Sequence, residues 1–123
     1  MLGAITGDII GSVYEFEAHK TKEFCLFTDQ STFTDDTILT VAVADVLLHG
    51  GSYVEAFKQF YRRYPHPSGG YGARFQAWAS SPDSEPYNSW GNGSAMRVSP
   101  VAYVHSDMDA VLQTARKIAA AVA

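Results

Sequence analysis

The sequence predicts an all-α protein folded as a single domain. Apolar residues recur at helical spacing through most of the 123 residues, and no segment shows the strict alternation of apolar and polar residues that a half-buried strand requires. Glycine, proline and capping residues divide the chain into about six helical segments. Because 46% of the residues are hydrophobic, one domain over residues 1–123 can bury a core of its own.

The first predicted helix covers Met1 to Tyr14 and carries a stripe of three glycines. Gly3, Gly7 and Gly11 recur at every fourth position, and each costs roughly 1 kcal/mol of helix propensity relative to alanine. We therefore expect the backbone of a neighbouring segment, or a ligand, to approach this stripe closely. Polar residues follow the same spacing at Asp8, Ser12 and Glu15, so a continuous helix places them on one face.

The second and third helices are predicted from their end signals. Residues 19–33 have no lasting period and are expected to form a loop. Thr34 begins a helix that runs to about His49 and stops at Gly50-Gly51. Ser52, followed by Glu55 three residues later, is typical of the next helix start, and the prolines at 65 and 67 end that helix.

The second half of the chain is expected to hold shorter helices. We predict a helix at 73–79, a surface loop at 80–89, and a helix after residue 91 that Pro100 shortens or kinks. Ser106 is predicted to cap the last helix, 107–122. The final residues are still apolar and helical in character, without a stop signal, so we expect the chain to be part of a longer domain.

Composition excludes several classes of function. The net charge of -4, with no clustered basic residues, gives no nucleic-acid-binding patch. The single cysteine, Cys25, excludes an internal disulfide and a multi-cysteine zinc site. No apolar run approaches the roughly 20 residues of a membrane span, and the N-terminus lacks a signal-peptide pattern. These features predict a cytoplasmic chain that does not enter a membrane.

Residues 34–37, Thr-Asp-Asp-Thr, have two interpretations. As a helix start, Thr34 would cap the first turn, and the carboxylates of Asp35 and Asp36 would favour the helix dipole. As a metal site, the same oxygens suit a hard cation such as Mg²⁺ or Mn²⁺. A helix start permits both roles, because side chains can converge there, although three oxygens do not complete an octahedral site.

Residues 91–97, Gly-Asn-Gly-Ser-Ala-Met-Arg, also have two interpretations. Glycines before a helix let backbone N–H groups approach a phosphate. The segment lacks the lysine of a P-loop, and a plain turn whose Arg97 pairs with a buried carboxylate explains it equally well. Nearby, Tyr87 and Trp90 are candidates to stack on a nucleobase or sugar, although packing in the core is the more common role of such rings.

Three motifs in order resemble the ADP-ribosylglycohydrolase family, including its dinitrogenase reductase-activating glycohydrolases. They are the segments 7–15, 34–37 and 91–97, and they span most of the chain. The resemblance is to the N-terminal portion of the family. It implies an all-α fold, a compact multi-helix orthogonal bundle with a site for two Mg²⁺ or Mn²⁺ ions in a central cleft. It also implies hydrolysis of the glycosidic bond between ADP-ribose and a modified acceptor.

The resemblance also assigns roles to residues of this sequence. Thr34, Asp35 and Asp36 would be metal ligands, and Glu15 with Asp36 would act in catalysis. The residues implied to hold the ADP-ribose are Gly91, Asn92, Gly93, Ser94, Met96 and Arg97. The remaining metal ligands of the family lie in a C-terminal Asp-x-Asp-Thr-type motif that is absent here, so the chain would carry about half of the metal site.

The resemblance leaves more than one function open. An active chain would act on an ADP-ribosylated protein or on a small molecule that contains ADP-ribose. A non-catalytic member, which binds ADP-ribose or is structural like the crystallin-like relatives, is the alternative, and a plain helical oligomerisation domain is the third. Apolar surface that the missing helices would cover is expected to favour self-association.

Overall fold

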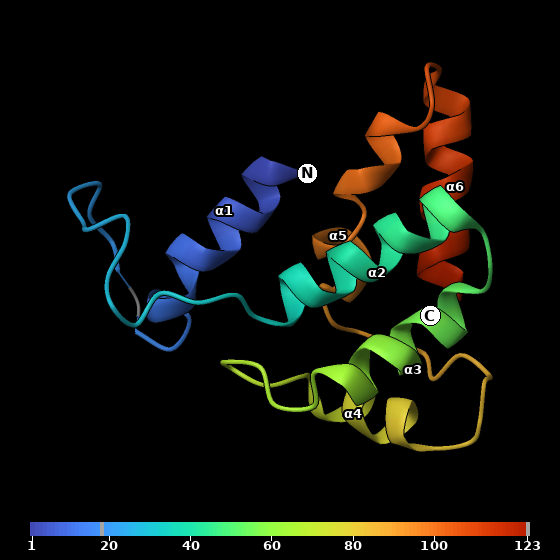
Figure 1. Ribbon diagram of the computed structural model, residues 1–123, viewed down its shortest axis with the longest axis horizontal. Coiled ribbons are helices and arrows are strands. Elements are labelled where there is room, and N and C mark those ends of the chain that lie inside the picture. Colours follow the sequence, from blue (N-terminus) through green and yellow to red (C-terminus); the bar gives the residue numbers. More distant parts are fainter. Residues whose placement is uncertain (18, 123) are drawn as a thin grey trace.

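The computed structural model describes residues 1–17 and 19–122, and over these residues the chain is helical, as the sequence predicts (Figure 1). No β-strand occurs within these ranges, and one isolated parallel bridge joins Thr34 to Ser68. The elements in chain order are α1 (Leu2–Gly11), η1 (Ser12–Tyr14), α2 (Asp35–His49), α3 (Tyr53–Arg63), α4 (Ala73–Ser80), α5 (Gly93–Met96), η2 (Ser99–Tyr103) and α6 (Met108–Ala120).

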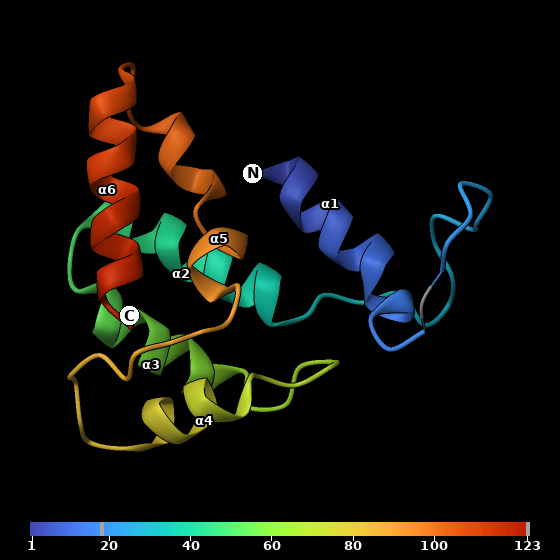
Figure 2. The same ribbon diagram turned by 180° about the vertical axis from the view of Figure 1, so that it is seen from behind.

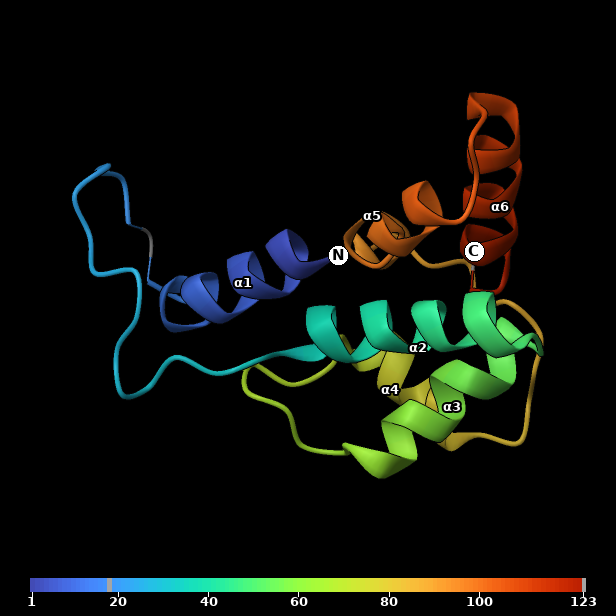
Figure 3. The ribbon, with the colours of Figure 1, turned by 45° about the horizontal axis from the view of Figure 1, so that its top comes forward.

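Helix α2 is the centre of the fold. It packs against α3, α1, α5 and η2, and Figure 3 shows it running between α3 and α4 on one side and α5 and α6 on the other. Its length follows from its end residues: Thr34 is extended and caps the start, and Gly50, at a φ of 79°, ends the helix. Both predicted ends are therefore confirmed.

The core forms where α2 meets α3, α4, η2 and α6. Its members are Ile38, Leu39, Ala42, Val43, Phe57, Tyr71, Phe75, Trp78, Ala79, Val101, Ile118 and Val122. By contrast, α1 buries no side chain and contacts the body mainly through α2. The loop between α1 and α2 extends away from the rest of the molecule (Figure 1). The N-terminal segment is thus attached to the core rather than part of it.

Two predictions about the glycines and helix ends were wrong. A Cβ built on Gly3, Gly7 or Gly11 would meet no atom of another segment within 4 Å, so the expected approach of a neighbouring backbone is wrong. The alternative, a ligand beside the stripe, stays a prediction. The last helix is capped by Asp107, whose carboxylate accepts from the Ala110 N–H at 2.9 Å, and not by Ser106. Asp107 takes the cap because its extended backbone directly precedes the first residue of α6.

The predicted helix after residue 91 is divided in two. Helix α5 ends at Met96, and Pro100 lies in the separate 3₁₀ helix η2. Proline at this position removes a backbone donor, so the helix cannot continue through it. The break brings Arg97 and Val98 to a bend between the two short helices.

A buried lysine holds the loop after α4. Lys58 is 4% exposed, and its ammonium donates to the carbonyl oxygens of Trp78, Ser81 and Asp83. The same ammonium lies 4.8 Å from the centre of the Trp78 ring. Three carbonyl oxygens and an aromatic face replace the water that the charge loses on burial.

We expect Lys58→Met to destabilise the chain by about 2 kcal/mol, because it leaves buried carbonyl oxygens without a donor. Chemical denaturation followed by circular dichroism measures the loss. Lys117→Met is the matched control, since Lys117 is exposed on α6. Equal stability of the two variants would contradict the role of Lys58.

Candidate functional site

The second motif lies at the N-terminus of α2, where the backbone changes from extended to helical. Thr34 is 5% exposed, and its hydroxyl oxygen accepts from the Asp36 N–H at 3.2 Å. Asp35 and Asp36 follow in the first turn. The cap interpretation is therefore confirmed, and it places the three candidate metal ligands side by side.

Asp8 of the first motif fixes this helix start from the outside. Its carboxylate accepts from the Thr34 N–H at 2.9 Å, the Thr34 hydroxyl at 2.6 Å and the Thr37 N–H at 3.2 Å. The Thr37 hydroxyl donates a fourth hydrogen bond. Because Thr34 gives its proton to Asp8, a lone pair of its oxygen stays available for a cation. Asp8 thus orients one candidate ligand.

Glu15 of the first motif lies beside the turn at residues 68–70. A Cβ at Gly69, where φ is 75°, would collide with the Glu15 carboxylate. Both the conformation and the contact therefore require glycine at this position. The loop that follows Glu15 returns to α2 past Ser12, whose hydroxyl accepts from the Thr32 N–H at 3.1 Å.

A pocket of about 560 Å³ joins the three motifs, and we call it the acidic pocket. Residues of all three motifs line it, together with the turn before α4. These lining residues are Gly7, Asp8, Gly11, Ser12, Glu15, Thr34, Asp35, Asp36, Gly69, Gly70, Tyr71, Gly72, Asn92 and Met96, with Phe16 at the edge. Segments more than 80 positions apart in the sequence meet here, counting from Asp8 to Asn92.

The acidic pocket carries uncompensated negative charge. Burial, followed by the charges of Asp36, Glu15 and Asp8, raises the pKa of Asp35 to about 6 from 3.8. Burial, followed by the charges of Asp8 and Glu15, also raises the pKa of Asp36. Carboxylates that are partly desolvated and repel one another gain from a bound cation. The chemical type of these oxygen donors therefore fits a divalent metal ion.

The donor set is incomplete in number. Within residues 1–17 and 19–122, no group of three or more histidine, cysteine, aspartate or glutamate side chains is arranged to hold a metal ion. The start of α2 offers two carboxylates and one hydroxyl, and the carboxylates of Asp8 and Glu15 line the same pocket. The expectation that the chain carries about half of a metal site stays a prediction.

A second pocket, of about 260 Å³, continues from the first, and we call it the loop pocket. Asp35, Gly72, Asn92 and Met96 line both, so the two form one groove. Gly91 and Gly93 line the loop pocket, as do the rings of Tyr87 and Trp90. Figure 2 shows α5, which follows this turn, in front of the N-terminal half of α2. Ser94 lines neither pocket.

Arg97 is a buried cation beneath the loop pocket. Its side chain is 1% exposed, and burial lowers the pKa of the guanidinium to about 10. Its Nε and Nη2 atoms have no hydrogen-bond partner among the described residues. The guanidinium lies over the Phe57 ring, 4.3 Å from its centre. The expected pairing with a buried carboxylate is therefore absent from the described part of the chain.

Sequence reasoning missed two contributors to the site. Asp8 was placed on a polar face without a role, although a lone carboxylate in an otherwise apolar helix is a signal of a specific partner. The turn at Gly69 and Gly70 was given no role. Both glycines have a φ above 70°. The turn that they form lies against the Glu15 carboxylate at Gly69.

The comparisons with known proteins agree with these observations. The family model described as ADP-ribosylglycohydrolase matches residues 1–121. ADP-ribosylhydrolase ARH3 of Xenopus tropicalis is 29% identical over 94% of this chain. The chain spans 41% of the length of that relative. No solved structure matches. Among the described helices, none combines the length and apolarity that crossing a bilayer requires.

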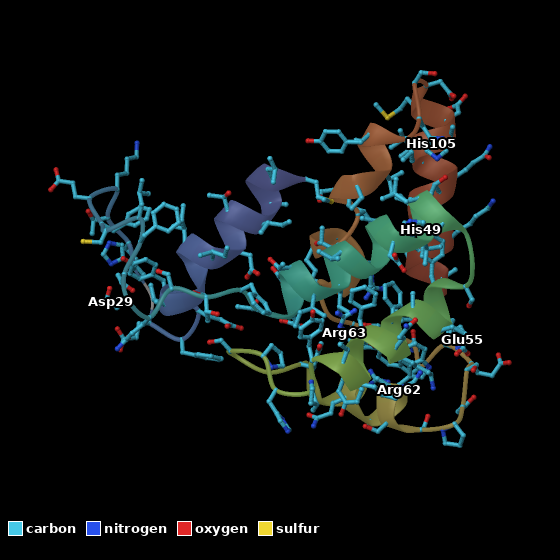
Figure 4. All side chains as sticks on the ribbon, viewed as in Figure 1. Asp29, His49, Glu55, Arg62, Arg63 and His105 are labelled. Carbon is cyan, nitrogen blue, oxygen red and sulfur yellow. The ribbon has the colours of Figure 1, made fainter. Side chains whose placement is uncertain are left out.

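We expect Asp8→Asn to destabilise the chain by about 2 kcal/mol, because an amide cannot accept all of the hydrogen bonds that reach the carboxylate. Asp29→Asn is the matched control, since Asp29 lies on the exposed loop between α1 and α2 (Figure 4). Thermal and urea denaturation measure both variants. An Asp8→Asn chain as stable as the control would show that these bonds do not hold α1 to α2.

Asp35 makes the metal-free chain less stable as pH rises. Its pKa is about 6 in the folded chain and near 3.8 when unfolded, so the folded state holds the proton more tightly. The stabilisation is complete below the lower value and is lost as pH rises through the higher one. In EDTA, we expect Asp35→Asn to be more stable than wild type at about pH 7.5 and to show a smaller fall in melting temperature above about pH 4. Identical pH profiles would contradict this.

Proposed function

Because this chain belongs to the ADP-ribosylglycohydrolase family, we propose that it forms the metal-binding and ADP-ribose-binding part of a hydrolase. The enzyme would cleave the glycosidic bond between ADP-ribose and a modified acceptor. The observation that carries the proposal is the acidic pocket, where residues of all three motifs meet. Such a groove, with a few convergent polar groups, is typical of a small-molecule site.

Thr34, Asp35 and Asp36 would hold Mg²⁺ or Mn²⁺. Their oxygens are the ligand type that these ions prefer, and the raised pKa values of both carboxylates support a need for positive charge. Bound there, a divalent cation would supply charge that orients ribose hydroxyls and lowers the pKa of water. Further ligands from the rest of the protein or from water would complete its coordination.

Glu15 and Asp36 are the proposed acid–base pair of this chain. Both line the acidic pocket, and Glu15 is exposed to solvent beside Gly69. Cleavage of a glycosidic bond develops positive charge at the anomeric carbon, which a nearby carboxylate stabilises. A carboxylate open to solvent can also take a proton from water or give it to the leaving group.

The loop pocket is the proposed site for the rest of ADP-ribose. Gly91, Asn92 and Gly93 would present backbone N–H groups to the diphosphate. Trp90 is 85% exposed at the edge of the pocket, so its face is open for a ring of the ligand. Binding at this distance from the reacting bond would position that bond in the acidic pocket.

A non-catalytic, ADP-ribose-binding protein of the same fold is the alternative. The incomplete donor set within the described residues favours it. The presence of Glu15, Thr34, Asp35 and Asp36 in one pocket favours the enzyme. Release of ADP-ribose from a modified peptide distinguishes the two functions, because only the enzyme turns over.

Self-association is a further part of the proposal. A pocket of about 260 Å³ lined by Ala44, Leu47, Leu48, Tyr103 and other apolar residues opens beside α2 and η2. Leu48 and Tyr103 are both more than 70% exposed. Exposed apolar surface of this kind is commonly covered by another protein segment. Light scattering across a concentration series measures whether a second copy covers it.

We expect ADP-ribose to bind more tightly with Mn²⁺ than with EDTA, since the cation offsets the negative charge of the acidic pocket. Asp36→Ala should remove this difference, which isothermal titration calorimetry measures. Asp29→Ala, on the loop between α1 and α2, should leave it unchanged. Binding of ADP-ribose that ignores both Mn²⁺ and Asp36→Ala would disprove the metal assignment.

A further inference from the structure

Arg97 is the charged side chain that the proposed function leaves unexplained. Buried polar groups are nearly always hydrogen-bonded, yet the Nε and Nη2 of Arg97 have no partner among the described residues. A buried charge without a partner costs stability. The burial of the Arg97 charge therefore needs another explanation, and the contacts of the guanidinium indicate one.

The guanidinium lies between the core and the glycine turn. On the core side, it stacks 4.3 Å from the centre of the Phe57 ring, which is fully buried on α3. On the turn side, its Nη1 atom lies 3.3 Å from the point that a Cβ of residue 93 would occupy. The guanidinium therefore lies between Phe57 and Gly93. The lack of a side chain at Gly93 leaves room for this close approach.

The turn leads into a short helix, α5, which contacts α2 and α6. Helix α5 has four residues and no side-chain cap at its start, and so short a helix is not stable by itself. One other buried side chain holds it: the Thr40 hydroxyl of α2 donates to the Met96 carbonyl at 3.3 Å. Thr40 and Arg97 are thus two buried side chains that hold the turn relative to the acidic pocket, beside the packing of Met96 against the core.

We infer that Arg97, which lies at the wall of the loop pocket, is a positioning residue that fixes the Gly91–Gly93 turn against Phe57. This inference rests on the proposed function, in which the turn binds the diphosphate. The guanidinium lies close to Phe57 on one side and to Gly93 on the other, and the compact ammonium of lysine does not reproduce this planar group.

Two variants separate the contributions of charge and shape. Arg97→Met keeps an apolar contact with Phe57 and loses the charge and the planar group, whereas Arg97→Lys keeps the charge. We expect Arg97→Met to weaken ADP-ribose binding by about tenfold, and Arg97→Lys to recover part of the loss. Ser99→Ala is the control, because Ser99 is a nearby buried hydroxyl without a partner that lines neither pocket.

Gly93→Ala tests the contact itself. Its methyl group would press on the guanidinium, so we expect weaker binding when Arg97 is present. In the Arg97→Met background, the flexible methionine can move, so Gly93→Ala should weaken ADP-ribose binding less. Residues in direct contact show this departure from additivity. Additive effects of the two substitutions would overturn the inference.

Amide hydrogen exchange tests the inference without a ligand. The Ala95 and Met96 N–H groups both donate to the Asn92 carbonyl and report on the turn. Arg97→Met should speed their exchange by about tenfold relative to the core amides of α2, and Ser99→Ala should not. Uniformly faster exchange would mean a general loss of stability and would overturn the positioning role. Faster local exchange in a chain that binds no ADP-ribose would uphold it and reject the proposed function.

Discussion

The contact between Asp8 and the start of α2 decides where the site residues lie. Helix α1 buries no side chain, so packing alone does little to hold it. One carboxylate compensates by accepting four hydrogen bonds from Thr34 and Thr37. A negative charge at a helix N-terminus is also favoured by the helix dipole. The contact fixes Glu15, seven residues after Asp8, relative to Asp35 and Asp36.

Helix α2 also fixes the distance from these residues to the other end of the groove. Its first turn carries the candidate metal ligands, and Thr40, one and a half turns later, binds the Met96 carbonyl. At 1.5 Å per residue, Thr34 and Thr40 are separated by about 9 Å along the axis. Because α2 is buried along much of its length, it is a rigid spacer between the acidic pocket and the glycine turn.

The structural features that the sequence predicts correctly are those that depend on residues close together in the chain. Thr34, Gly50 and Ser52 act within one turn of their own positions, so the helix ends they define are confirmed. The choice between Ser106 and Asp107 as a cap was wrong, because both can cap and only the backbone shows which one is extended. The bonds of Asp8 join residues 26 and 29 positions apart, and no local period reveals such a pair. The lack of a partner for Arg97 is likewise a property of packing.

The charges along the groove explain why a cation and an anionic ligand belong together. The acidic pocket holds Asp8, Glu15, Asp35 and Asp36, and it would repel a diphosphate that entered the adjoining loop pocket. Arg97 lies at the far side of that groove, where it is buried and its charge is only weakly screened by water. A divalent cation at the start of α2 would remove the repulsion at one end, while the charge of Arg97 would favour the anion at the other. Metal ion and ADP-ribose would then each increase the affinity of the chain for the other, as linkage between two sites requires.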